Sequence, residues 1–296
     1  MTIEKKYETE EEFLENYKPG DYERPSVTVD MLLFTTETVE NEDIKRVDKE
    51  ELKILLIKRA GFPYKNCWAL PGGFVDMNES LDEAVARELK EETNIENVYM
   101  EQLYTFGDVK RDPRMRVISP AYMALVDSKD LKIKASDDAK DVEWFTVSKK
   151  LINKTDSVIY WGLTLKARDV EMEYLVRDEV VKKGRINVVE TVSIEHVSGD
   201  KIAFDHFKII NLGLDRLKNK VEYKPIIFNL LPEKFTLTQL RHLYEILIGE
   251  KYDEKNFKRK ISQKVGVYME ELDEKQTGKG FKPAKLYRYN GETGSI

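Results

Sequence analysis

A short segment of this chain carries three glutamates at helical spacing. Glu88, Glu91 and Glu92 stand at positions i, i+3 and i+4, so a helix would place their carboxylates on one face, within about 100° of arc. Without a counter-ion these groups would repel one another. Carboxylate oxygens suit Mg²⁺ or Mn²⁺, and Mg²⁺ usually binds few protein carboxylates while it keeps waters and substrate phosphates. The spacing therefore favours a site for a divalent cation.

The residues around the glutamates weigh against the usual alternative, a solvated helix face with ion pairs. The segment follows Leu70-Pro71-Gly72-Gly73, five residues separate Gly73 from Glu79, and seven separate Glu79 from Arg87. In this register the segment resembles the Nudix family, whose members hydrolyse a nucleoside diphosphate linked to another group. The family usually has Gly where this chain has Asn94. Asn tolerates φ > 0, so the turn that ends the helix should be kept.

The resemblance implies a fold and a role for each residue of the segment. The fold is an α+β arrangement, the Nudix α/β/α sandwich. The metal would activate a water for attack on phosphorus, and glycines let the backbone come close to it. The implied catalytic residues are Glu79, Arg87, Glu88, Glu91 and Glu92, with Arg87 orienting the glutamates and Glu79 bracing the loop. The implied metal ligands are Gly73, Glu88, Glu91 and Glu92.

Composition bounds the class of protein. The chain has 296 residues, 35% of them charged and 41% hydrophobic, which suits a well-hydrated globular protein of two domains. No apolar run approaches the ~20 residues that span a bilayer, and no signal-peptide core stands out. The single Cys67 excludes an internal disulfide framework. We therefore expect a cytoplasmic protein without a membrane segment.

The pattern of residues predicts two domains, at 1–222 and 223–296. In the first we expect helices at 8–17, 80–93 and 207–217, and strands at 26–34, 53–58, 100–106, 117–126 and 141–146, with a hairpin loop at 37–50. Further strands at 170–176, 186–197 and 201–205 would add to the same sheet. The second domain has 14 Lys/Arg and 10 Asp/Glu, a net +4, which leaves about −10 for the first. An acidic body with a basic tail suggests different partners.

A loop rich in arginine lies between two predicted strands. Arginine can bind phosphate through two parallel hydrogen bonds, so the loop could bind a pyrophosphate. The alternative is a surface turn nucleated by Asp112-Pro113. The run from Arg111 to Tyr122 resembles bacterial Nudix proteins that handle ADP-ribose. The candidate substrate-binding residues are Arg59, Phe106, Arg111, Arg114 and Arg116. A carboxylate outside the segment, to act as the base, could be Asp137, Asp138 or Glu143, and Phe62 or Tyr64 could stack an adenine, with Trp68 more typical of core.

The C-terminal region predicts a winged helix-turn-helix. Thr236 to Gln239 has the form of a capping box, Gly249 fits the end of that helix, and Asp253 can cap a second, basic helix followed by two strands. The second helix would enter a major groove while lysines meet phosphates. The candidate DNA-binding residues are Asn256, Lys258, Arg259, Lys260, Lys279 and Lys282. A helical cap or dimerisation module with solvated lysines is the alternative.

The two regions together resemble the Nudix-related transcriptional regulators of NAD metabolism. The resemblance rests on Ala203-Phe204-Asp205-His206, on 230–237 and 256–260, and on 282–287. It implies a homodimer that senses ADP-ribose or a related nucleotide and binds operator DNA, although a sugar-responsive branch leaves the effector open. Because the segment keeps every carboxylate of the Nudix pattern, we expect Mg²⁺- or Mn²⁺-dependent hydrolysis as well. The alternatives are a sensing regulator without turnover, and a plain Nudix pyrophosphatase whose tail only dimerises.

Overall fold

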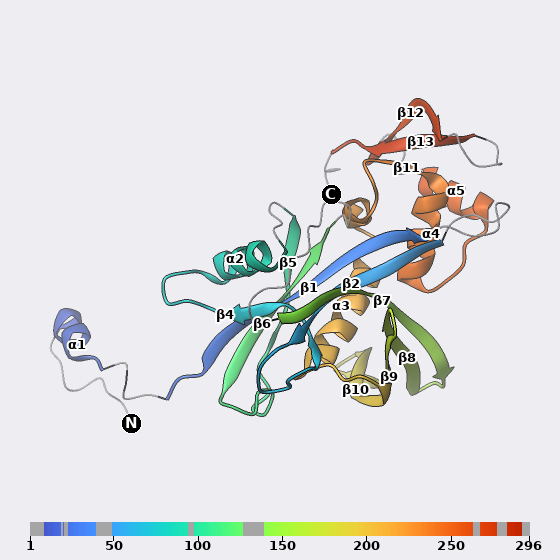
Figure 1. The fold of residues 1–296 in the computed structure, drawn as a ribbon. Helices are drawn as coiled ribbons and strands as arrows, with labels where there is room; N and C mark the ends of the chain where they lie inside the picture. The colour runs from blue at the N-terminus through green and yellow to red at the C-terminus, as the bar shows by residue number, and fades with distance from the viewer. Residues whose placement is uncertain are drawn as a thin grey trace.

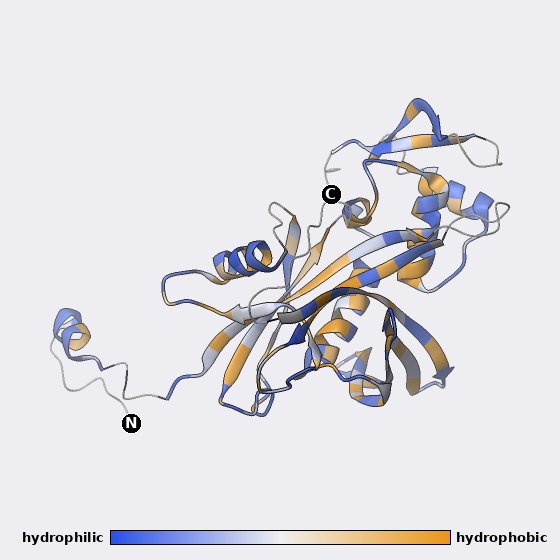
Figure 2. Ribbon diagram, viewed as in Figure 1, coloured by the Kyte–Doolittle hydropathy of each residue, from blue (hydrophilic) through white to orange (hydrophobic). Residues whose placement is uncertain are grey.

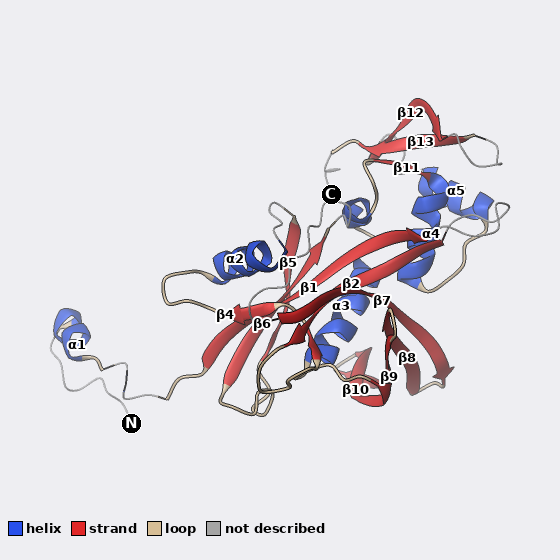
Figure 3. Ribbon diagram, viewed as in Figure 1, coloured by secondary structure: helices blue, strands red, loops and turns tan. Residues whose placement is uncertain are grey.

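The computed structural model describes residues 9–18, 20, 23–39, 49–93, 98–126, 139–262, 267–276 and 283–291. Figures 1 and 3 show a large sheet with helices on both faces and a smaller helical part with its own sheet. The helices are α1 (Glu10–Asn16), α2 (Leu81–Thr93), α3 (His206–Lys220), the 3₁₀ helix η4 (Pro225–Leu230), α4 (Leu237–Ile248) and α5 (Glu254–Ser262). No helix within these ranges is long and apolar enough to span a bilayer.

The large sheet has ten strands, in the order β10-β9-β8-β7-β2-β1-β6-β5, with β3 paired to β2 and β4 paired to β1. Its strands are β1 (Ser26–Val39), β2 (Lys49–Arg59), β3 (Trp68–Ala69), β4 (Gly72–Phe74), β5 (Tyr99–Phe106), β6 (Val117–Leu125), β7 (Ala139–Lys154), β8 (Val158–Ala167), β9 (Val170–Lys183) and β10 (Ile186–Gly199). Among the strands in the described ranges, only β1 and β6 pair in parallel, and the other pairs are antiparallel.

The hydrophobic stretch of β1 (Figure 2) lies inside the sheet, between β2 and β6, and is buried on both faces. Successive side chains of a strand point to opposite faces, so Leu32 and Phe34 belong to one core while Met31 and Leu33 belong to another. Helix α2 covers the second core, and α3 packs on the first. The predicted α/β/α sandwich is confirmed.

Helix α2 forms for reasons that are local to its sequence. Ser80 and Glu83 make reciprocal capping bonds, from Ser80 N–H to Glu83 Oε2 at 2.8 Å and from Glu83 N–H to Ser80 Oγ at 3.3 Å. Val85 and Leu89 are buried against the sheet, and Leu81 packs beside them. This apolar stripe leaves the glutamates on the remaining faces of the helix. The predicted helix and its inward stripe are both confirmed.

Two predictions about strands were wrong. The hairpin loop expected at 37–50 is shorter, because β1 and β2 stay paired as far as Val39 opposite Lys49. The segment 201–205 is a turn with one bridge, between Ile202 and Trp68, rather than a strand. The strands expected at 170–176 and 186–197 lie in β9 and β10, which do extend the first sheet, together with β8, which was not predicted.

Helix α3 runs along the sheet opposite α2. Gly213 allows this close packing, because a Cβ there would stand 2.1 Å from Leu32 Cδ2. Lys149 on β7 bonds both oxygens of Asp215, at 2.7 and 2.9 Å. Near the helix end, Lys220 pairs with Glu101 on β5. Helix α3 is therefore anchored to both halves of the sheet.

The C-terminal part has the elements of a winged helix. Thr236 caps α4 with a complete capping box, and Gly249 ends it in the left-handed conformation, φ 78°. Asp253 Oδ1 accepts from two N–H groups at the start of α5. These predicted caps are confirmed. A three-stranded sheet follows, in the order β11-β13-β12, with β11 (Lys234–Thr236), β12 (Met269–Gln276) and β13 (Ala284–Tyr289).

The winged part packs directly on the large sheet. One continuous core includes Phe34 of β1, Leu243 of α4 and Phe257 of α5. Thr36 Oγ donates to the Leu230 carbonyl at 2.6 Å, and Tyr244 OH donates to the Val221 carbonyl at 3.2 Å. The domain boundary that we expect, between residues 222 and 223, falls between α3 and η4 and stays a prediction.

Candidate functional site

Arg87 joins α2 to the loop that precedes it. Its guanidinium makes two bonds to the Glu79 carboxylate, Nε to Oε2 at 3.0 Å and Nη2 to Oε1 at 2.7 Å. Nη1 donates to Glu88 Oε1 at 2.8 Å and to Glu91 Oε2 at 3.4 Å. Nη2 also donates to the Phe74 carbonyl at 3.1 Å. One arginine thus holds the loop and two of the three glutamates in a fixed arrangement.

The two glycines before this loop make close contacts of different kinds. A Cβ on Gly73 would stand 2.0 Å from Glu88 Oε1, so the carboxylate lies directly against the backbone of β4. A Cβ on Gly72 would stand 2.1 Å from the Val29 carbonyl oxygen, and Gly72 has φ 151°. Gly73 therefore makes room for Glu88, whereas Gly72 makes room for the neighbouring strand.

The arginine also sets the protonation of the acidic groups. Its side-chain hydrogen bond, together with the Asp76 N–H, lowers the pKa of Glu79 from 4.5 to about 2. Burial raises the pKa of Glu88 despite the bond from Arg87. The hydrogen bonds to Glu79 and Glu88 raise the pKa of Arg87. Glu79 is therefore a fixed anion, while Glu88 holds its proton more readily than an ordinary glutamate.

The glutamate side chains of α2 supply oxygen atoms, which suit a divalent cation. Glu88 and Glu92 are partly or fully buried and Glu91 is exposed, and all three offer only oxygen. Within the described part of the chain, no three His, Cys, Asp or Glu side chains are already gathered around one point. The backbone at Gly73, which a Cβ would fill, lets the Glu88 carboxylate approach. A bound cation would neutralise phosphate and acidify a water.

The loop arginines have different environments. Arg111 is 8% exposed; it bonds both oxygens of Asp205, at 3.2 and 2.8 Å, and Asp30 Oδ2 at 2.9 Å. Burial opposes its charge, but the two aspartates outweigh burial and raise the pKa of Arg111. Arg116 donates to the carbonyls of Asp108 and Val117. Arg111 is thus a buried ion-pair residue whose guanidinium is engaged by two aspartates, and its candidate role in substrate binding stays a prediction.

Arg114 and Arg59 do face a partly open surface. Arg114 donates from Nε and Nη2 to the Asp112 carboxylate, at 3.1 and 2.8 Å, which fixes the plane of its guanidinium. That guanidinium lies 5.8 Å from the Phe74 ring and 6.0 Å from the Phe204 ring. Arg59 lies 5.0 Å from the Phe204 ring. No ligand role was predicted for Phe74 or Phe204, although Phe74 directly follows Gly73 and Phe204 lies in one of the segments that carry the family resemblance.

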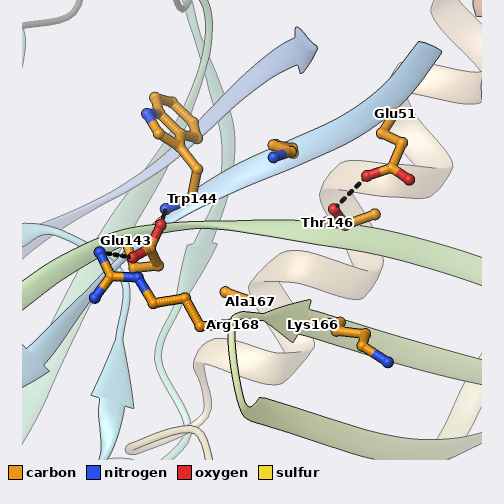
Figure 4. A pocket seen from close by; sticks show the side chains of 8 residues that line it. Glu51, Glu143, Trp144, Thr146, Lys166, Ala167 and Arg168 are labelled. Carbon is orange, nitrogen blue, oxygen red and sulfur yellow. Dashed lines mark hydrogen bonds and ion pairs between the residues drawn. The ribbon is translucent and has the colours of Figure 1, made fainter. Parts of the chain in front are cut away.

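The aromatic candidates for ligand binding and the carboxylate candidates for the general base also differ in their surroundings. Phe106 is buried in the main core, and so is Trp68, whereas Phe62 is 82% exposed. Glu143 pairs with Arg168 (Figure 4). Asp137 and Asp138 lie outside the described residues. Glu143 belongs to a pocket of about 430 Å³ that shares no residue with the α2 cluster and is lined by Glu51, Lys53, Glu143, Trp144, Thr146, Lys166, Ala167 and Arg168.

Helix α5 presents its predicted DNA-binding residues to solvent. Asn256, Lys258 and Arg259 are exposed, while Phe257 is buried beneath them. Lys260 is exposed as well, and its ammonium also lies 4.9 Å from the Tyr252 ring and donates to Tyr252 OH at 3.2 Å. The two wing candidates, Lys279 and Lys282, lie outside the described residues. All four candidates on α5 are therefore accessible to solvent, and their contact with DNA stays a prediction.

Comparison with known families agrees with both parts. A NUDIX domain model matches residues 18–159, and the NrtR DNA-binding winged helix domain matches residues 227–289. The "ADPR responsive transcriptional repressor NtrR" of Acinetobacter baylyi is 31% identical over 98% of this chain and 92% of its own length. The ADP-ribose pyrophosphatase of Methanocaldococcus jannaschii is 45% identical over 34% of this chain and 58% of its own length.

A solved structure extends this likeness to the whole fold. Shewanella oneidensis NrtR, in complex with a 27mer DNA, has a TM-score of 0.59 and 28% identity, over 89% of this chain and 93% of its own. The fold and the site thus define a Nudix domain joined to a DNA-binding winged helix. The chain belongs to the NrtR family of Nudix-related transcriptional regulators.

Proposed function

We propose that this chain is a transcriptional regulator that binds ADP-ribose, or a related nucleoside diphosphate derivative, in its Nudix domain and binds operator DNA through α5. One observation carries the proposal: the Arg87 cluster and the exposed basic helix α5 occur in one chain and pack on opposite faces of β1, which contributes Leu33 to the core under α2 and Phe34 to the core under α5. A ligand event in the first part therefore has a packed path to the second. The names of the relatives, an ADPR-responsive repressor and a DNA-bound NrtR, support this reading.

The ligand side would use the partly open surface beside the α2 cluster. Arg59 and Arg114 supply guanidinium groups that match phosphate geometry, and Asp112 already holds Arg114 in one plane. Arg116 is exposed on the same loop. Arg111 would act indirectly, because it fixes that loop to Asp205. The predicted ligand-binding set thus becomes Arg59, Arg114 and Arg116.

Metal-dependent hydrolysis is the finer part of the proposal. Nudix hydrolases generally use divalent metal ions, and we propose Mg²⁺ or Mn²⁺ here. Glu88, Glu91 and Glu92 would hold the ion, Arg87 would orient the glutamates, and Glu79 would keep Arg87 in place. The M. jannaschii pyrophosphatase supports turnover. A regulator that binds the ligand without turnover is the main alternative.

The DNA side would use the exposed residues of α5. Asn256, Lys258 and Arg259 are placed to contact a groove, and Lys260 would hold the helix against Tyr252. We propose a homodimer, because winged readers commonly bind paired half-sites. Binding to operator DNA would place the chain in the cytoplasm. A C-terminal part that serves only in assembly would not account for the match to a DNA-binding winged helix domain.

A nucleotide panel tests both halves in one experiment. The intact protein is incubated with Mg²⁺ and each nucleotide, then scored for product release and for retention of DNA from its own upstream region. ADP-ribose should yield AMP and ribose 5-phosphate, and Glu91→Gln or Glu92→Gln should abolish turnover. If the protein retains upstream DNA but hydrolyses nothing with any metal, the regulator without turnover is correct. If it retains no specific fragment, the regulator proposal fails.

A further inference from the structure

Phe204 has a backbone conformation that a bulky residue rarely adopts. Its φ is 53°, in the left-handed region, where the Cβ of an L-residue crowds the following carbonyl. Such a conformation persists only where the surroundings enforce it, and it is found most often at functional sites. The question is therefore what holds this turn and what the phenyl ring does there.

Hydrogen bonds at Ala203, Asp205 and His206 hold the turn in place. The Ala203 N–H donates to the Trp68 carbonyl at 2.7 Å, and Asp205 is bonded to Arg111. The Leu70 N–H donates to His206 Nδ1 at 2.9 Å. His206 is buried, and burial lowers its pKa, which suits an imidazole that accepts a bond at Nδ1. These contacts tie the turn to the strand that leads into Gly72-Gly73.

The ring of Phe204 lies between cations rather than inside the core. It is only partly buried, the Arg59 guanidinium is 5.0 Å from its centre, and the Arg114 guanidinium is 6.0 Å away. Its aromatic neighbours are Tyr64, at 4.7 Å between ring centres, and His206, at 5.3 Å. Phe74 is a second ring near the Arg114 guanidinium, at 5.8 Å. Flat apolar rings beside two guanidinium groups suit a ligand with a planar base next to phosphates.

Simple packing is the plainer explanation, and it accounts for less. Phe204 does touch the small cluster of Ile57, Ala69 and Ala203. A residue that only packs at this turn would not need a left-handed backbone, and glycine or asparagine would fit the conformation with less strain. Nor does packing require that two arginines converge on the ring.

We propose that the turn Ile202–His206 completes the ligand site, with Phe204 stacking on the nucleobase while Arg59 and Arg114 bind the phosphates. This rests on the proposed function. The turn lies beyond residues 18–159, the range that the NUDIX domain model covers. It also begins α3, whose far end leads through Val221 to α4. A base stacked on Phe204 would thus contact the element that joins the ligand site to the winged helix.

The test is calorimetric titration of the full-length protein with ADP-ribose and, separately, with ribose 5-phosphate, which lacks the base. Phe204→Ala should weaken ADP-ribose binding roughly 5- to 150-fold, the range for losing one base–aromatic stack. It should change ribose 5-phosphate binding less than about twofold. Phe204→Trp should restore ADP-ribose binding, and Phe204→Leu, which keeps apolar volume without a ring, should not. The leucine and tryptophan variants decide the matter if the alanine variant does not fold.

Phe62→Ala is the comparison variant, because Phe62 is the competing candidate for stacking from the sequence, 82% exposed and with the Lys65 ammonium 5.6 Å from its ring centre. It should bind ADP-ribose like the wild type. If Phe62→Ala loses affinity and Phe204→Ala does not, or if both bind normally, the inference is overturned while the proposed function stands. If the wild type binds neither probe, the proposed function fails and the inference fails with it.

Discussion

Replacing Gly73 with alanine should disable the metal site while leaving the fold intact. The new Cβ would stand 2.0 Å from Glu88 Oε1 and 2.6 Å from its Cδ, so the carboxylate must retreat by about 1.5 Å to reach an ordinary contact. That movement breaks the 2.8 Å bond from Arg87. A misplacement of ~1 Å in a catalytic group costs about 100-fold in rate. The stability cost should stay near 1 kcal/mol, because the far end of a side chain can swing away.

The neighbouring glycine provides the contrast. A Cβ on Gly72 would stand 2.1 Å from the Val29 carbonyl oxygen, which is backbone and cannot swing, and its φ of 151° disfavours any side chain. Gly72→Ala should therefore destabilise the fold by about 3 kcal/mol or more, whereas Gly73→Ala should not.

Three measurements distinguish the two variants: the melting temperature, Mn²⁺ binding followed by electron paramagnetic resonance, and hydrolysis of ADP-ribose. Gly73→Ala should melt within a few degrees of the wild type and bind Mn²⁺ more weakly. Its rate of hydrolysis, where the wild type hydrolyses, should fall about 100-fold. Wild-type Mn²⁺ affinity in Gly73→Ala would refute the reasoning, since it would mean that Glu88 does not need its place beside β4.

The remaining predictions concern acid stability, a buried ion pair and DNA contacts. The low pKa of Glu79, about 2, gives stability that is present above pH 4.5 and lost as the pH falls towards 2, so Glu79→Gln should flatten acid unfolding in that window by circular dichroism. Arg111→Leu should cost about 3–5 kcal/mol in urea unfolding, because two buried aspartates lose their counter-ion; an unchanged midpoint would contradict this. Lys258→Ala should reduce the salt slope of DNA binding by about 0.9, while Lys260→Ala, whose ammonium lies on Tyr252, should leave it unchanged. The reverse order would place Lys260 in the groove.

The sequence predicts well the features whose causes are local. The stripe of Val85 and Leu89, the capping box at Thr236 and the left-handed Gly249 each depend on a few neighbouring residues. The register of the α2 glutamates with Arg87 likewise fixes which side chains can meet, because a helix brings residues four apart together. These features were therefore predictable without knowledge of the fold.

The features that escaped prediction depend on distant partners. Arg111 and Arg114 are the same residue type in one loop, yet only Arg111 meets Asp30 and Asp205, which lie 81 and 94 residues away. The sequence predicted a strand at 201–205. The left-handed backbone at Phe204 was not predictable, because it depends on contacts with the neighbouring strand rather than on the residues of the turn. The sequence does not distinguish Lys260 from the other lysines of α5, because its contact with the Tyr252 ring depends on the fold.

The central claim is that ligand binding in the Nudix domain controls DNA binding by the winged helix. The most direct test is a fluorescence anisotropy titration of the labelled upstream fragment with the full-length protein, with and without ADP-ribose, repeated with Glu91→Gln to remove turnover. The account predicts that the protein retains the fragment, that ADP-ribose changes its affinity at least several-fold, and that Glu91→Gln responds like the wild type. An affinity for DNA that is identical with and without saturating ADP-ribose would contradict it.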